Sequence, residues 1–279
     1  MLNVLVTSQD GTNLNVPFKS FVFNGGESQV KIDIIPIAPG TPVVIKAKIM
    51  SANDVMELLV LTDAIKRNIS KRIQLEMPYL PYARQDRVCD AGEALSLKVF
   101  CDLINSQEYE TVTIWDVHSD TSLALLNNVR NVQQWQLVKA TFPDGLPKET
   151  IIVAPDAGAS KKAWEVATRM NLQMIQAMKH RDVETGKITD TTIMVLPAHD
   201  ITSATKFLIV DDICDGGRTF IELAKKLKGN PNPEVHLYVT HGIFSQGIDV
   251  FDGLIDHIYC PNVFHPELFE QTKLQSMIN

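Results

Sequence analysis

One segment of the sequence combines acidic, glycine and hydroxyl residues in a pattern that suits binding of phosphate and sugar. The apolar residues 207–210 are followed by Asp211-Asp212, then by Gly216-Gly217 and Thr219. Backbone N–H groups of a glycine turn at the start of a helix bind anions. Two adjacent carboxylates accept hydrogen bonds from vicinal hydroxyl groups, such as those of a ribose. The alternative is an ordinary connection between strand and helix, in which Asp215 or Thr219 caps the helix.

A second segment places charged and amide side chains between prolines. Residues 78–87 read Pro-Tyr-Leu-Pro-Tyr-Ala-Arg-Gln-Asp-Arg. Arg84 offers a planar fork for phosphate oxygens, and Gln85 can donate to or accept from a nucleotide. We interpret this segment as a candidate nucleotide loop, and a surface turn with solvated charges is the alternative.

These segments resemble the phosphoribosyl-diphosphate synthetases and, more distantly, the type I phosphoribosyltransferases. Residues 78–87 are similar to the P-Y-x-P-Y-A-R-Q-D motif of the synthetases. Residues 207–219 resemble their ribose-phosphate loop, an apolar strand followed by D-D-x-x-D-T-x-G-T. The matching segments follow the family's order along most of the chain.

The resemblance implies an acceptor site in the second half of the chain. Asp211 and Asp212 would hold the ribose hydroxyls. The 5-phosphate would be wrapped by Asp215, Gly216, Gly217, Arg218 and Thr219. Residues 152–162 resemble the family's V-x-P-D-A-G-G-x-K-R loop, in which Asp156, Ala157 and Gly158 would receive the transferred diphosphate and Asp156 would coordinate a metal. Asp156 as an ordinary helix cap is the alternative.

The resemblance places the nucleotide in the first half of the chain. Arg84, Gln85 and Asp86 would contact ATP. Phe23 and Glu27 resemble a turn that receives adenine, usually from a neighbouring subunit, so we expect a dimer-based homo-oligomer. Phe23 can stack on a purine, and Glu27 can read its exocyclic amine.

Three further residues are expected to act during the transfer. His118, at the end of a segment similar to the family's D-L-H strand, would help position the magnesium–nucleotide together with Asp156. Because magnesium prefers oxygen ligands, a direct bond to His118 is not required, and a structural histidine is the alternative. Lys179 and Arg181 resemble the K-x-R that begins the family's mobile catalytic loop, continued by the polar residues 182–192.

The implied activity is an ATP-dependent diphosphokinase that uses Mg²⁺. It would move the β,γ-diphosphate of ATP to the anomeric 1-hydroxyl of a ribose 5-phosphate-type acceptor and release AMP. Catalysis would come from Lys179, Arg181, His118 and Asp156, without a covalent enzyme intermediate.

One departure leaves the acceptor open. Where the family has T-x-G-T, this chain has Gly216-Gly217-Arg218-Thr219. Loss of a threonine hydroxyl and gain of an arginine could open a phosphate site for an esterified phosphate. Ribose 5-phosphate and ADP-ribose are therefore both candidate acceptors. ADP-ribose would fit a phage-borne branch that acts in NAD salvage.

Two other functions remain as alternatives. A phosphoribosyltransferase would share the Asp211-Asp212 loop, but it does not explain Arg84, Gln85 and Asp86. A catalytically silent regulatory subunit would explain the altered loops, but the presence of four residues argues against it: His118, Asp156, Lys179 and Arg181.

Short β-branched runs alternate with helical patterns, which predicts an α/β fold of two phosphoribosyltransferase-like lobes, each a mainly parallel sheet flanked by helices. Strands are expected at 43–49, 72–78, 111–117, 149–154, 206–211 and 234–240, and helices at 54–68, 95–105, 159–170 and 219–227. The proline-containing stretch 140–148 suggests a division into an ATP-side lobe, 1–140, and a ribose-phosphate lobe, 141–279.

Composition narrows the class of protein. The chain has 279 residues and a net charge of -7, which argues against a general nucleic-acid binder. Its four cysteines form no C-x-x-C pair, so we expect neither a zinc site nor a disulfide framework. No apolar run reaches the length of a membrane span. Because residues 1–4 lack a basic region followed by an apolar one, we expect no signal peptide. We expect a cytoplasmic protein, in the host cytoplasm if it is phage-encoded.

Overall fold

The computed structural model describes residues 1–7, 13–34, 41–181, 188–194, 206–229 and 233–270. The chain forms two compact units, Met1–Val132 and Gln133–Asn279. Helix α4, Gln134–Thr141, packs on helix α5 and strand β13 of the second unit. The compact units therefore divide before α4, whereas the sequence-based division at residue 140 falls near its end.

The first unit contains a six-stranded sheet in the order β2-β1-β5-β6-β7-β8. Strands β5 to β8 are parallel, and β1 is antiparallel to both β2 and β5. Strands β3 and β4 form a separate hairpin beside helix α1. The elements are β1 Leu2–Thr7, β2 Asn13–Asn15, β3 Phe18–Val22, β4 Ser28–Ile32, β5 Val43–Ala47, α1 Ala52–Asn68, β6 Ile73–Glu76, α2 Ser96–Asn105, β7 Thr111–Trp115, α3 Asp120–Leu125 and β8 Val129–Val132.

The second unit contains a sheet in the order β11-β10-β9-β12-β13-β14, with β15 also beside β13. All pairs are parallel except β10 with β11. Its remaining elements are β9 Thr150–Ala154, α5 Ser160–Met170, β10 Gln173–Arg181, β11 Ile188–Met194, β12 Lys206–Cys214, α6 Arg218–Leu227, β13 Glu234–Gly242, a 3₁₀ turn Asp249–Phe251, β14 His257–Tyr259, β15 Asn262–Val263 and α7 Glu267–Glu270.

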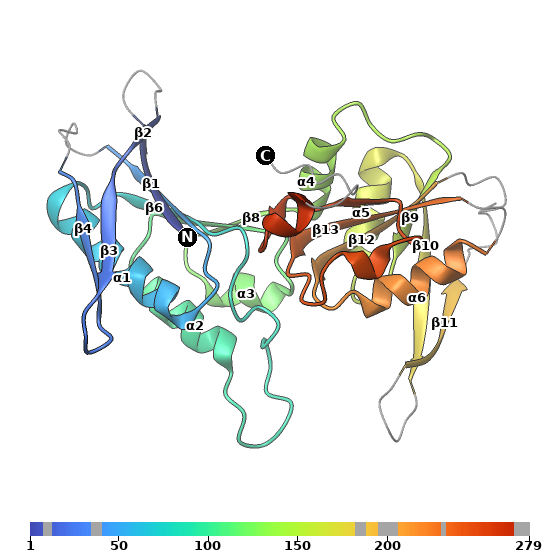
Figure 1. The fold of residues 1–279 in the computed structure, drawn as a ribbon, viewed down its shortest axis with the longest axis horizontal. Coiled ribbons are helices and arrows are strands. Elements are labelled where there is room, and N and C mark those ends of the chain that lie inside the picture. The colour runs from blue at the N-terminus through green and yellow to red at the C-terminus, as the bar shows by residue number, and fades with distance from the viewer. Residues whose placement is uncertain (8–12, 35–40, 182–187, 195–205, 230–232, 271–279) are drawn as a thin grey trace. The chain divides into compact units, whose positions relative to one another are not determined.

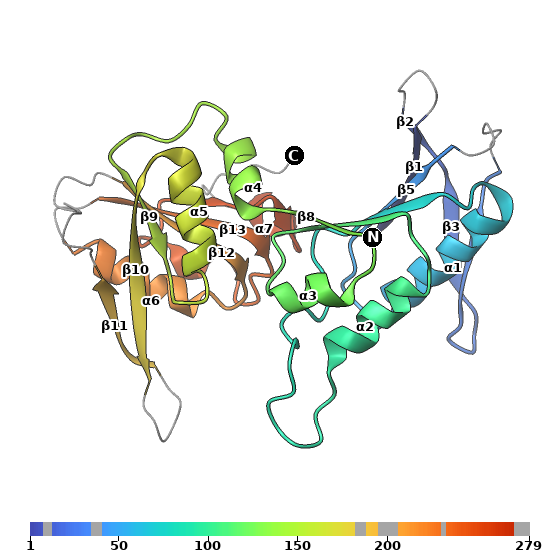
Figure 2. The same cartoon turned by 180° about the vertical axis from the view of Figure 1, so that it is seen from behind.

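The crossovers between parallel strands decide which face of each sheet a helix covers. In the first unit, β5 to β8 follow one another in one direction, so α1, α2 and α3 lie on one face (Figure 1). In the second unit the direction reverses between β9 and β12, so α5 covers one face and α6 the other (Figures 1 and 2). These arrangements confirm the expected α/β fold.

The sequence patterns explain the elements that were expected. All five residues of β9 are buried, as in a strand covered on both faces. Helix α6 buries an apolar stripe that includes Phe220, Leu223 and Leu227. Helix α1 begins with a capping box, in which the Ser51 hydroxyl accepts from the Asp54 N–H at 3.3 Å and the Asp54 carboxylate accepts from the Ser51 N–H at 2.8 Å.

Two expectations about element bounds need correction. Strand β12 continues to Cys214, because Asp211, Ile213 and Cys214 keep pairing with β13, so the acidic pair lies inside the strand end. Part of the expected polar segment 182–192 belongs to β11, an antiparallel partner of β10, and residues 182–187 lie outside the described residues. Among the described residues, no helix has the length and apolar character to cross a lipid bilayer.

The buried His236, near the start of β13, forms a cluster with the half-buried side chains of His257 and Tyr259 on β14. His236 is 3% exposed, its ring centroid lies 4.7 Å from that of His257, and its Nδ1 lies 3.4 Å from the Tyr259 hydroxyl. Burial, together with the positive charges of Lys206 and His257, lowers the pKa of His236 to about 4. Nearby Glu234 opposes this shift but does not cancel it.

We predict that this cluster destabilises the protein in mild acid. An unfolded histidine gains its proton near pH 6.5, whereas folded His236 gains it near pH 4, so the unfolded state binds more protons between these values. The free energy of unfolding should fall by at most about 3 kcal/mol as the pH drops from about 6.5 to 4. Urea unfolding across this range measures the slope. His236→Gln should flatten it, and the exposed control His265→Gln should not. If His236→Gln shows the same pH dependence as the wild type, groups other than His236 cause the loss of stability in acid.

Candidate active site

A glycine turn joins β12 to α6 and has a conformation that only glycine fits well. Gly217 precedes the helix with φ +76°, in the left-handed region. A Cβ atom at this position would lie 2.5 Å from Cζ of the buried Phe251. Gly216 has room, since the nearest atom to its added Cβ is Gln246 Cγ at 3.6 Å. The Gly217 position therefore combines close packing with a positive φ.

The turn presents backbone donors at the helix N-terminus. The amides of Phe220 and Ile221 bond to the Gly217 carbonyl, each at 3.0 Å. Within the described part of the chain, the amides of Gly216, Arg218 and Thr219 form no hydrogen bond. Unpaired N–H groups at the positive end of a helix bind anions. The expected phosphate residues thus supply three unbonded amides within the described turn, and Arg218 adds an exposed guanidinium at the first helical position.

The turn is braced by the chain that follows β13. The Ser245 hydroxyl donates to Asp215 Oδ1 at 2.7 Å, and the Ser245 amide donates to the Asp215 carbonyl at 3.2 Å. The amide of Ile243 bonds to the Cys214 carbonyl at 2.8 Å. Ile243 and Ser245 therefore hold the turn between β12 and α6 in place.

Three carboxylates gather at the carboxyl end of the second unit's sheet. Asp211 Oδ1 accepts from the Asp212 amide at 2.9 Å, and Asp212 Oδ2 lies 3.0 Å from Lys162 Nζ on α5. Burial, followed by the charges of Asp212 and Asp156, raises the pKa of Asp211 well above its ordinary value, against an opposing effect of Lys162. The structure therefore brings the predicted site residues Asp156, Asp211 and Asp212 together.

The loop after β9 supplies the third carboxylate. Asp156 Oδ1 accepts from the Ala159 amide at 3.1 Å, which helps to begin α5. Asp156 is half-buried, while Ala157 and Gly158 are exposed beside it. Asp156 is not the N-cap of α5, because that position is taken by Ala159, whose amide donates to the Asp156 carboxylate. The metal and diphosphate roles of Asp156 stay predictions.

Magnesium fits this carboxylate cluster only with help from a substrate. The described residues contain no group of three or more His, Cys, Asp or Glu side chains arranged to hold a metal alone. Mg²⁺ is usually bound by one or two carboxylates together with phosphate oxygens and water. The accumulated negative charge around Asp211 suits a divalent cation bound in that way. His118 lies in the first unit and Asp156 in the second, so their joint metal role stays a prediction.

The predicted nucleotide loop spans the connection between β6 and α2. The amide of Trp115 on β7 donates to the Pro78 carbonyl at 2.9 Å, and the amide of Leu97 on α2 donates to the Gln85 carbonyl at 3.3 Å. Arg84 and Gln85 are exposed. The two backbone bonds hold the loop at the carboxyl end of the first unit's sheet, where nucleotides bind in folds of this kind.

Asp86 anchors the same loop from inside. Its side chain is 6% exposed and lies 3.0 Å from Arg87 Nε. Burial works to raise the pKa of Asp86, but the neighbouring Ser119 hydroxyl and the charges of Arg87 and His118 outweigh it, so this pKa lies below its ordinary value. The structure thus brings Asp86 and His118 together, and it gives Asp86 a structural task in addition to its predicted ATP contact.

The predicted adenine-binding residues lie at the turn between β3 and β4. Phe23 is 54% exposed and its ring packs edge-on against Phe21 with 5.3 Å between centroids. The Phe23 amide donates to the Glu27 carbonyl at 2.9 Å, and Glu27 is also exposed. An exposed aromatic ring beside a carboxylate is suited to purine stacking.

The predicted catalytic pair Lys179 and Arg181 lies on β10. Lys179 pairs with Thr191 and Arg181 with Ile188 of β11. The side chains of both residues lie outside the described part of the structure, so their catalytic role stays a prediction.

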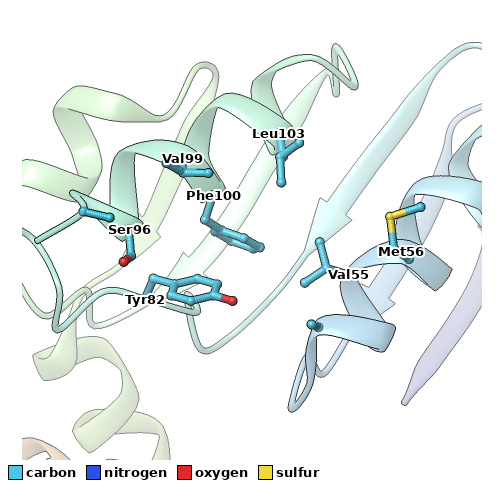
Figure 3. A pocket seen from close by; sticks show the side chains of 9 residues that line it. Val55, Met56, Tyr82, Ser96, Val99, Phe100 and Leu103 are labelled. Carbon is cyan, nitrogen blue, oxygen red and sulfur yellow. The ribbon is translucent and has the colours of Figure 1, made fainter.

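An apolar pocket lies beside the predicted nucleotide loop. It has a volume of about 370 Å³ and lies between α1 and α2 (Figure 3). Its walls include Val55, Met56, Tyr82, Val99, Phe100 and Leu103. Because no charged side chain lines it, this pocket does not suit a triphosphate. The polar groups of Arg84 and Gln85, rather than this pocket, remain the candidate phosphate contacts.

Lys162 and Ser245 are site residues that sequence reasoning did not assign. Lys162 stands in the loop string that resembles the family, yet nothing local indicates its partner, since Asp212 lies 50 residues further along the chain. The sequence indicates only that Lys162 lies on the helix after β9. That helix contacts strand β12, which is paired with β9.

We predict that Gly217→Ala destabilises the protein, whereas Gly216→Ala does not. The first change forces an alanine into a left-handed conformation, at about 1–2 kcal/mol, and adds a clash with Phe251. The second meets only ordinary contacts, so its effect should stay within about 0.5 kcal/mol. Urea unfolding of both variants measures the difference. Equal stability of the two variants would contradict the described turn.

Known proteins resemble this chain along most of its length. The N-terminal domain of ribose phosphate pyrophosphokinase matches residues 6–107, and the phosphoribosyl transferase domain matches residues 142–249. A ribose-phosphate pyrophosphokinase of Cereibacter sphaeroides is 33% identical over 199 residues, 70% of this chain and 57% of that protein. One of Pyrococcus abyssi is 29% identical over 243 residues, 86% of this chain and 80% of that protein.

The fold has a close counterpart as well. The crystal structure of phosphoribosylpyrophosphate synthetase from Mycobacterium smegmatis superimposes with a TM-score of 0.75 at 19% identity, covering 94% of this chain and 86% of that one. At this identity the likeness concerns the fold. The two domain matches cover more than half of the chain in the family's order, and the chain belongs to the ribose-phosphate pyrophosphokinase family.

Proposed function

We propose that the protein transfers the β,γ-diphosphate of ATP to the anomeric 1-hydroxyl of a ribose 5-phosphate-type acceptor and releases AMP. The observation that carries the proposal is that two kinds of group follow one another at the end of β12. They are the carboxylates of Asp211 and Asp212, and the unbonded amides of Gly216, Arg218 and Thr219. The first group suits the vicinal hydroxyls of a ribose and the second suits a phosphate. Membership of the pyrophosphokinase family supports the same activity.

The reaction forms one bond and breaks one. The acceptor's 1-oxygen bonds to the β-phosphorus of ATP, the bond from that phosphorus to the bridging oxygen breaks, and AMP leaves with this oxygen. The hydroxyl proton passes to solvent or a nearby base. Since no enzyme nucleophile is needed, the protein contributes positioning and neutralisation of charge.

Each group of residues has a distinct task in this proposal. Asp211 and Asp212 orient the ribose, and the turn at 215–219 holds its phosphate. The loop at Asp156, Ala157 and Gly158 receives the diphosphate. Arg84 anchors the nucleotide, with Gln85 and Asp86 beside it, and Lys179 and Arg181 neutralise the charge that develops on the transferring group. Bound Mg²⁺ supplies charge neutralisation at the phosphate oxygens, and Asp156, with His118 on the nucleotide side, would hold it.

Two acceptors fit the turn. Ribose 5-phosphate needs only the amide donors at Gly216, Arg218 and Thr219. ADP-ribose has the same free 1-hydroxyl, and the exposed Arg218 guanidinium suits its second phosphate group. The second acceptor would yield ADP-ribose pyrophosphate and would place the enzyme in NAD salvage.

We also propose that the enzyme works as a dimer-based homo-oligomer. The exposed Phe23 and Glu27 at the tip of a hairpin suit an adenine bound by a neighbouring copy. A nucleotide shared in this way would make the assembly necessary for activity.

We predict that the purified protein releases AMP from Mg-ATP only when an acceptor is present. Separate incubations with ribose 5-phosphate and with ADP-ribose identify the acceptor, and AMP is measured by chromatography. Asp211→Asn should lose acceptor-dependent release, because the altered side chain can no longer offer two acceptor oxygens. Folded protein that releases no AMP with either acceptor would favour a phosphoribosyltransferase or a silent regulatory subunit.

We predict that Lys179→Ala keeps nucleotide binding but loses turnover. A cation that acts on the transferring group contributes mainly in the transition state, so kcat should fall on the order of 10²–10³-fold while the Kd for Mg-ATP changes little. Rapid-quench AMP release and calorimetry measure the two quantities. Near-normal kcat in this variant would remove Lys179 from the mechanism.

A further inference from the structure

An ion pair joins the helix after β9 to the acidic pair of β12. Lys162 Nζ lies 3.0 Å from Asp212 Oδ2, and the two side chains are 27% and 11% exposed. The pair formed by Lys225 and Glu222 on α6 is 54% and 48% exposed, as ordinary surface pairs are. Partial burial of the two charges costs desolvation free energy, which can cancel the attraction between them. A contribution to folding stability is therefore a weak explanation for this ion pair.

The position of the pair matters more than its strength. Asp156, Asp211 and Asp212 place three carboxylates within electrostatic reach of one another, and Lys162 opposes their repulsion. The Asp212 backbone amide is fixed by Asp211 Oδ1 at 2.9 Å. With Lys162 held on Oδ2, the rotation of the Asp212 carboxylate is fixed as well. Both acids therefore have one oxygen tied to a defined partner, and this sets the direction of each carboxylate plane.

We propose that Lys162 is a positioning residue that orients Asp212 toward the hydroxyls of the ribose acceptor. This inference rests on the proposed function, because it assigns the acidic pair to the acceptor. Lys162 acts through Asp212 rather than on the transferring diphosphate. Its loss therefore weakens acceptor binding and leaves the handling of ATP nearly unchanged.

Direct contact between Lys162 and the diphosphate is the competing role. An ammonium group that bound the diphosphate would lower the KM for ATP and raise kcat. If the ion pair has only a structural role, loss of Lys162 would lower the melting temperature and leave both KM values unchanged. Separate KM values for the two substrates therefore distinguish the three roles.

The experiment compares Lys162→Met, which removes the charge but keeps the length, with Lys162→Arg, which keeps the charge. Lys225→Met is the matched control, since it removes a lysine from an exposed helix ion pair. Ribose 5-phosphate and ADP-ribose are each titrated by calorimetry without ATP, and AMP release gives kcat and both KM values. Circular dichroism checks folding, and Lys162→Gln replaces Lys162→Met if that variant does not fold.

We expect Lys162→Met to raise the Kd and KM for the acceptor about tenfold or more, with the KM for ATP within about twofold. Lys162→Arg should recover most of the loss, and Lys225→Met should match the wild type. Unchanged acceptor binding in Lys162→Met, or an effect on ATP of equal or greater size, would overturn the inference while wild-type turnover upholds the proposed function. Wild-type protein that neither binds nor converts an acceptor would overturn the proposed function, and the inference with it.

Discussion

The reversal of strand order between β9 and β12 is the constraint on which the proposed acceptor site depends. Pairing between these strands ends at Ile209 with Val153, whereas β12 continues alongside β13 as far as Cys214. The chain after β9 leads to α5 on one face and the chain after β12 to α6 on the other, and ligands of open α/β sheets bind at such switch points. Asp156 and the acidic pair of β12 lie at this point. The positive charge of Lys162, which forms an ion pair with Asp212, offsets part of the repulsion between these carboxylates.

In the proposed phosphate site, the hydrogen-bond donors at the turn are backbone amides rather than side chains. The amides of Gly216, Arg218 and Thr219 keep their direction as long as Gly217 keeps its left-handed conformation and its contact with Phe251. This explains how the chain can depart from the T-x-G-T pattern of its relatives and still present an anion site. The departure adds the exposed Arg218 beside the proposed phosphate site.

Sequence alone could predict the strands and helices that carry strong apolar patterns, together with the loops that follow them. The core strands β9, β12 and β13 are such cases, as are helices α5 and α6, each found within a few residues of its expected bounds. Short elements without such a pattern were missed, among them α3, β8 and α4. The contact between Lys162 and Asp212 could not be predicted, because it depends on how α5 packs beside β12 rather than on any local pattern. The brace from Ser245 to Asp215 spans 30 residues and depends in the same way on tertiary structure.

The central claim, that the turn after β12 binds the acceptor's phosphate through its amides, can be tested by NMR. ¹⁵N-labelled protein is titrated with ribose 5-phosphate and the ¹H–¹⁵N shifts are followed. The account predicts saturable downfield shifts of the Gly216, Arg218 and Thr219 amide protons, since each gains a hydrogen bond to a charged oxygen. Saturable shifts confined to other regions, such as the apolar pocket between α1 and α2, with these three amides unmoved, would contradict it.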